Sequence, residues 1–162
     1  MDGIYTDENR KYQIDLSAAI WHMGTLKQLY DETIGGALSD VDWIAETEDE
    51  IFLIEYKNPS FVQKHGKNEF YFKVQQKYYG STFFMLAREN KKPINFMYII
   101  DDGIMDSVLR KKATASIMKR LPFELQKKEE IFLPLIKQFS ILIPTEWNDT
   151  YPQFPLTRLQ PA

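Results

Sequence analysis

Side chains that could hold a metal ion are concentrated in residues 40–57. Asp42 is followed thirteen residues later by the triplet Glu55-Tyr56-Lys57. In a β-strand, residues i and i+2 point to the same face, so Glu55 and Lys57 would project side by side. Charged groups near a core are retained only when they are paired or bound to an ion. Because the nearby ligands are oxygen atoms, we expect a hard cation, Mg²⁺ or Mn²⁺.

Two predicted strands must position these residues. The first covers residues 38–46 and contains Asp42, and the second covers residues 50–57. The polar turn at residues 47–49 joins them closely enough to predict a hairpin. The second strand is apolar on both faces, so it should be central and buried. Asp42 and Glu55 converge if the register of the hairpin permits it.

The remaining pattern predicts a mixture of helices and strands. Apolar residues at intervals of three and four predict an amphipathic helix over 12–32, ended by Gly35-Gly36. After the hairpin we expect a basic helix over 62–79 closed by Gly80, strands over 81–87, 94–100 and 140–143, helices over 104–120 and 124–139, and a Pro-rich extended tail over 144–162. This order predicts an α/β or α+β protein in which helices cover the faces of a sheet.

Length and composition fit one globular domain over residues 1–162. The chain of 162 residues is 44% hydrophobic and 27% charged, which argues against disorder. The absence of cysteine excludes disulfides, cysteine nucleophiles and thiolate metal sites. No segment reaches the roughly 18 apolar residues of a membrane span, and the N-terminus lacks the features of a signal peptide. We therefore expect a cytoplasmic protein without a membrane partner.

The net charge of −3 conceals an asymmetry. Residues 1–56 carry a balance of −10, residues 57–92 carry +6, and residues 93–162 carry +1. The average alone argues against a non-specific nucleic-acid binder. The basic segment, however, begins at Lys57, directly beside the candidate site, and it could contact phosphates.

Asp42, the triplet Glu55-Tyr56-Lys57 and the predicted order of elements together resemble the PD-(D/E)xK nuclease superfamily, over about residues 12–100. This group includes restriction endonucleases, junction resolvases and recombination exonucleases. The chain has Val41 where the name motif has proline. The resemblance implies a central mixed sheet flanked by helices, with a restriction-endonuclease-like αβββαβ core. No clear strand is predicted between the first helix and Asp42.

The resemblance also implies roles for individual residues. Asp42 and Glu55 would hold Mg²⁺ or Mn²⁺ against a scissile phosphate, and Lys57 would orient or deprotonate the attacking water. Asp40 could join the metal site. Gln75 fits the Gln-x-x-x-Tyr pattern of the exonuclease branch and is a candidate substrate-contacting or site-shaping residue. Members often place a further acid on the first helix, and the candidates for it are Asp15 and Glu32.

The implied function is metal-dependent hydrolysis of phosphodiester bonds in DNA, with RNA as the alternative substrate. Four lysines of the predicted basic helix are candidates for phosphate contacts: Lys64, Lys67, Lys73 and Lys77. Cutting both strands would require a homodimer.

Several other interpretations stay open. Asp42, Glu55 and Lys57 could form a structural ion pair across a hairpin. The chain could also be a catalytically inactive nuclease-fold protein that acts as an interaction or nucleic-acid-binding module. A small-molecule phosphoesterase is less well supported, because such sites usually show a glycine-rich phosphate cradle or histidines.

Overall fold

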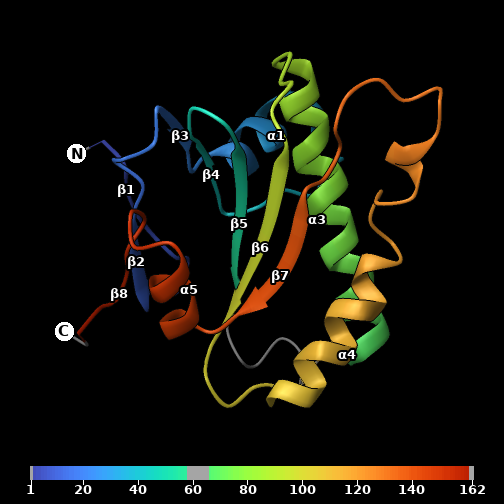
Figure 1. The fold of residues 1–162 in the computed structure, drawn as a ribbon. Helices are drawn as coiled ribbons and strands as arrows, with labels where there is room; N and C mark the ends of the chain where they lie inside the picture. Colours follow the sequence, from blue (N-terminus) through green and yellow to red (C-terminus); the bar gives the residue numbers. More distant parts are fainter. Residues whose placement is uncertain (1, 58–65, 161–162) are drawn as a thin grey trace.

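The computed structural model describes residues 2–57 and 66–160, which form two β-sheets and four α-helices. The larger sheet is mixed and has the strand order β3-β4-β5-β6-β7 (Figure 1). The predicted class, a mixed α/β protein with helices on the faces of a mixed sheet, is therefore confirmed. No helix in the described part of the chain is long and apolar enough to cross a membrane.

The centre of the larger sheet consists of two long buried strands. They are β5 (Ile51–Lys57) and β6 (Ile94–Ile100), and they pair in parallel. On one side, β4 (Trp43–Glu46) and then β3 (Trp21–Met23) add antiparallel strands, and on the other side β7 (Gln138–Leu142) adds a parallel one. Runs of β-branched and aromatic residues explain the two central strands, because such side chains pack well on a pleated surface that is covered on both faces.

The two faces of this sheet are covered by different elements. Helices α1 (Leu26–Ile34), α3 (Lys67–Ala87) and α4 (Ser107–Met118) lie on one face. The other face carries α5 (Pro144–Thr150) and a small sheet made of β1 (Ile4–Thr6), β2 (Tyr12–Asp15) and β8 (Leu156–Arg158) (Figure 1). Side chains alternate accordingly along β5: Leu53 packs toward α3, whereas Phe52 and Ile54 pack toward the small sheet.

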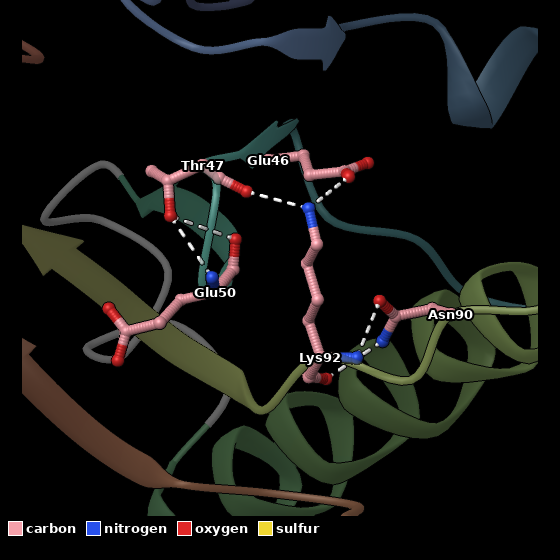
Figure 2. A network of polar contacts seen from close by, with 5 residues as sticks. All are labelled: Glu46, Thr47, Glu50, Asn90 and Lys92. Atoms are coloured by element: carbon pink, nitrogen blue, oxygen red, sulfur yellow. Dashed lines mark hydrogen bonds and ion pairs between the residues drawn. The ribbon is translucent and has the colours of Figure 1, made fainter.

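The β4–β5 hairpin is braced at its turn by Lys92, which precedes β6. The Lys92 ammonium donates to Glu46 Oε2 at 2.6 Å and to the Thr47 carbonyl oxygen at 2.9 Å, and Asn90 holds the Lys92 backbone (Figure 2). Within the turn, the Thr47 hydroxyl accepts a hydrogen bond from the Glu50 amide. These contacts fix the turn end of the hairpin, and Glu55 lies near its other end.

Two sequence predictions fail because an apolar pattern fits more than one structure. The helix predicted over 12–32 is wrong in its first part, which forms β2 and β3 before α1 begins at Leu26. Tyr12, Ile14 and Leu16 are all buried, which is the alternation of a strand. The strand predicted over 81–87 is also wrong, because α3 continues through Gly80 to Ala87.

The remaining differences lie around the sheet and in the C-terminal part. The first hairpin strand begins at Trp43 rather than at residue 38. Residues 124–139 hold only a 3₁₀ turn (Leu125–Lys127) and the start of β7 in place of a helix. The predicted extended tail instead contains α5 and β8, because Trp147 is fully buried and anchors it. A strand of the large sheet, β3, precedes α1, and none of the described residues between α1 and β4 forms a strand.

Candidate functional site

Asp42 and Glu55 lie directly opposite each other where the hairpin ladder ends. The register pairs Trp43 with Ile54, so Asp42, one residue before β4, faces Glu55. The Asp42 backbone amide donates to Glu55 Oε1 at 2.9 Å, and the Tyr56 amide donates to Asp42 Oδ2 at 3.0 Å. These two hydrogen bonds continue the hairpin through side chains and hold both carboxylates on the face that α3 covers. The predicted convergence of these two residues is therefore present in the structure.

Two ammonium groups stand at the second oxygen of Glu55. Lys57, two residues along β5, lies 3.3 Å from Glu55 Oε2, and Lys77 of α3 lies 3.1 Å from the same atom. The Glu55 side chain is fully buried, whereas the Lys57 side chain is 26% exposed and opens toward solvent. Oε2 accepts no hydrogen bond of regular geometry from the described residues, so the ion pairs are its main stabilisation.

Helix α3 shapes the loop that carries Asp40 and Asp42. The Lys77 ammonium donates to the Asp40 carbonyl oxygen at 3.0 Å, and the Ser81 hydroxyl accepts from the Val41 amide at 2.9 Å. Between these contacts, Gly80 lies against the backbone of Ser39. Residues 77, 80 and 81 lie on one side of the helix, so a single helical surface places the loop beside Glu55.

Burial and neighbouring charges shift the pKa values of the acidic residues in the site. Burial, followed by the neighbouring Glu55 carboxylate, raises the pKa of Asp42 well above its ordinary value. Burial also raises the pKa of Asp40, although Lys77 opposes this effect. For Lys77, burial acts to lower the pKa, but the carboxylates of Glu55 and Asp42 outweigh it and the pKa is raised. Lys77 is thus held as a cation, and a positive charge close to Asp42 would stabilise its ionised form.

Tyr98 lies beneath the site on β6, paired with Glu55 across the parallel ladder. Its hydroxyl is buried and has no hydrogen-bond partner among the described residues. Burial, reinforced by Glu55 and Asp42, raises the pKa of Tyr98. Glu55 is therefore flanked on β6 by an uncharged tyrosine side chain.

A surface pocket of about 310 Å³ opens beside Asp42 and Asp40. Its other walls come from the β1–β2 turn, including Asp7, and from Lys27 at the start of α1. The Asp7 carboxylate accepts hydrogen bonds from three backbone amides of its own turn, including that of Lys11 at 2.7 Å, so it serves the turn. Asp42 and Asp40 therefore border a pocket that opens to solvent.

The residues fit a Mg²⁺ or Mn²⁺ ion whose remaining coordination positions would be filled by substrate and water. No group of three or more His, Cys, Asp or Glu side chains in the described ranges forms a metal-binding cluster. Mg²⁺ does not need one, since it commonly binds through one or two carboxylates together with waters and substrate phosphate. Asp42 and Glu55 supply two adjacent carboxylates, and the buried Glu55 Oε2 retains acceptor capacity.

The other predicted residues are distributed differently. Gln75 lies midway between Tyr71 and Tyr79, which both contact Arg120, so it belongs to the helix face toward the end of α4 rather than to the face that carries Lys77. Lys67 is exposed, and Lys73 is partly exposed, 3.8 Å from Glu69. Lys64 lies outside the described residues. Asp15 accepts from the Ser17 amide and Glu32 from Gln28, so neither is assigned to the site.

The sequence pattern placed Lys77 among the phosphate-contacting lysines and did not predict its contact with Glu55. Because the sequence predicted that the helix ends at Gly80 and is followed by a strand, it gave no reason to expect that α3 packs over Glu55. The available signal was Gly80 itself, because a glycine inside a helical pattern often marks a close approach of another backbone. The roles of Ser81 and Tyr98 were missed for the same reason, since they depend on tertiary packing.

Comparisons with models of known families, with curated proteins and with solved structures each find no significant match. The function is therefore inferred from the residues and their geometry.

Proposed function

We propose that this protein is a metal-dependent nuclease that hydrolyses phosphodiester bonds in DNA. One observation carries the proposal: Asp42 and Glu55 face each other near the C-terminal end of a buried central strand, and the partly exposed Lys57 ammonium lies 3.3 Å from Glu55. Structural ion pairs seldom need two adjacent carboxylates, because their mutual repulsion is costly. A restriction-endonuclease-like core belongs to this proposal. It is supported by the order α1, hairpin, α3, β6, with β3 supplied from before α1.

The residues of the site divide the work of hydrolysis. Asp42 and Glu55 would hold Mg²⁺ or Mn²⁺, with Asp40, which lines the same pocket as Asp42, as a further candidate ligand. The bound cation would polarise the phosphate and lower the pKa of a water molecule. Lys57 would orient or deprotonate the attacking water and would offset the negative charge on the leaving oxygen as its bond to phosphorus breaks. Lysine suits this role as a compact point charge on a flexible stem.

The basic side of α3 would bind the DNA backbone. Lys73 precedes Lys77 by four residues, so both lie on the same face of the helix, and Lys67 lies further toward its exposed start. Contacts of this kind position a substrate without reading its sequence. The proposed substrate is therefore DNA without sequence specificity, and RNA would be tested beside it.

The test is a cleavage assay on plasmid DNA, single-stranded DNA and RNA with Mg²⁺, Mn²⁺ or EDTA. We expect cleavage that needs the cation and falls by about 10²–10⁴-fold in Lys57→Ala. Lys112→Ala is the matched control, because Lys112 is an exposed helical lysine on α4. Circular dichroism establishes that both variants are folded. Cleavage that is equal in Lys57→Ala and wild type would remove the assigned role of Lys57.

One observation favours a second candidate, a non-catalytic interaction module. Lys57 and Lys77 both form ion pairs with Glu55 Oε2, as they would in a purely structural ion network. In that case the protein neither cleaves nucleic acid nor binds Mn²⁺, and Asp42→Asn leaves its binding to DNA unchanged. The cleavage assay and a Mn²⁺ titration separate the two candidates.

A further inference from the structure

Lys77 occupies a position between two oxygen atoms that would otherwise be available to a cation. Its ammonium lies 3.1 Å from Glu55 Oε2 on β5 and 3.0 Å from the Asp40 carbonyl oxygen in the preceding loop. Its side chain is only 18% exposed, so these contacts are held in a largely dry environment. Lys77 comes from a different element than Lys57, and both ammonium groups converge on the same carboxylate oxygen.

Two-metal hydrolytic sites place their ions about 3.5–4 Å apart and share carboxylates between them. Here Glu55 Oε1 already accepts from the Asp42 amide, and Oε2 faces two ammonium groups. Asp42 Oδ2 accepts from the Tyr56 amide. A second ion placed between Glu55 Oε2 and the Asp40 carbonyl oxygen would therefore have to displace Lys77.

The charges lead to the same conclusion. When all three are ionised, the carboxylates of Asp40, Asp42 and Glu55 carry one negative charge more than the two ammonium groups of Lys57 and Lys77 balance. One divalent cation turns this into a single positive charge. A second would leave three positive charges in a largely buried space, which is strongly unfavourable.

We propose that the site binds one divalent cation, and that Lys77 is a positioning residue whose ammonium takes the place of a second cation. Lys77 holds Glu55 and the Asp40 carbonyl oxygen together and thereby sets the position of Asp42. This inference rests on the proposed function, because it assumes that Asp42 and Glu55 bind the first cation.

The test counts Mn²⁺ ions by the electron paramagnetic resonance signal of the free ion during titration. We expect one Mn²⁺ per wild-type chain. Lys77→Gln keeps a side-chain N–H donor for the Asp40 carbonyl oxygen but loses the positive charge, so it should bind Mn²⁺ about tenfold more tightly. A simple loss of folding would weaken Mn²⁺ binding instead. Lys77→Arg, which keeps the charge, should still bind one Mn²⁺, and Lys112→Gln should match the wild type.

The outcomes separate the two proposals. Two Mn²⁺ ions in the wild type, or unchanged or weaker binding in folded Lys77→Gln, would overturn the inference and leave the nuclease proposal standing. No Mn²⁺ binding in the wild type, or equal binding in Asp42→Asn, would overturn the proposed function together with this inference. If Lys77→Gln does not fold, the wild-type count and the Lys77→Arg titration decide the question.

Discussion

Gly80 of α3 lies so close to Ser39 that a Cβ atom added to Gly80 would stand 1.8 Å from the Ser39 carbonyl oxygen. The next residue of the helix, Ser81, binds the Val41 amide, and Lys77 binds the Asp40 carbonyl oxygen. The loop that ends in Asp42 is therefore pressed onto α3 through its backbone. Any side chain at residue 80 must push this loop away from the helix.

Gly80→Ala is expected to lower the free energy of unfolding by about 1–3 kcal/mol through overpacking. The change is destabilising although alanine is the better helix former by about 1 kcal/mol. Urea denaturation measures it. Gln76→Ala, at an exposed position of the same helix, should stay within about 0.5 kcal/mol of the wild type. A Gly80→Ala protein as stable as the wild type would contradict the close packing of this loop.

Two buried tyrosines should respond oppositely to loss of the hydroxyl group. Tyr78 donates to the Leu135 carbonyl oxygen, so Tyr78→Phe should cost about 0.5–1.5 kcal/mol. The Tyr98 hydroxyl has no partner among the described residues, so Tyr98→Phe should be neutral or stabilising. Both side chains are fully buried, which makes them a matched pair for thermal or urea unfolding. A larger loss in Tyr98→Phe than in Tyr78→Phe would reveal a hydrogen bond at Tyr98.

Binding of DNA should depend on salt through the exposed lysines of α3. Removing one phosphate contact lowers the slope of log K against log salt by about one. Lys67→Ala and Lys73→Ala should each show this reduction and weaken binding to all DNA sequences alike. Fluorescence anisotropy at several salt concentrations measures the slope, with Lys112→Ala as the control. An unchanged slope in both variants would place the DNA elsewhere on the protein.

The Arg110–Glu146 pair, which joins α4 to α5, should contribute a pH-dependent stability. Burial alone would raise the pKa of Glu146, but hydrogen bonds from the Ile143 amide and Arg110 outweigh it, and the pKa is lowered from its usual 4.5. A carboxyl with a lowered folded-state pKa stabilises the fold above that usual value and loses the contribution as pH falls through the folded pKa. The wild type should therefore lose more stability than Glu146→Gln when the pH falls below 4.5. The effect should be small, because the Glu146 side chain is 42% exposed. Parallel loss in both proteins would contradict it.

Local sequence patterns correctly predicted the segments whose apolar residues fit only one type of secondary structure. The bounds 94–100 of β6 agree with the prediction, and β5 differs by one residue, because both strands are buried on two faces. The short hairpin predicted that Asp42 and Glu55 converge if the register permits it, and the register does bring them together. Residues 12–25 and 81–87 were mispredicted, since their apolar residues fit a helix and a strand alike. The contact of Lys77 with Glu55 joins residues far apart in sequence, and no local pattern encodes it.

The most direct test of the nuclease proposal is cleavage of labelled DNA across a Mg²⁺ titration, for wild type and Asp42→Asn in parallel. The asparagine side chain of this variant keeps an oxygen that can accept from the Tyr56 amide, so the fold should be retained while a metal-binding carboxylate is lost. We predict that wild-type cleavage rises with Mg²⁺ and is abolished by EDTA, and that Asp42→Asn cleaves at least about 100-fold more slowly. Equal cleavage by the two folded proteins, or none by the wild type at any Mg²⁺ or Mn²⁺ concentration, would contradict the proposal.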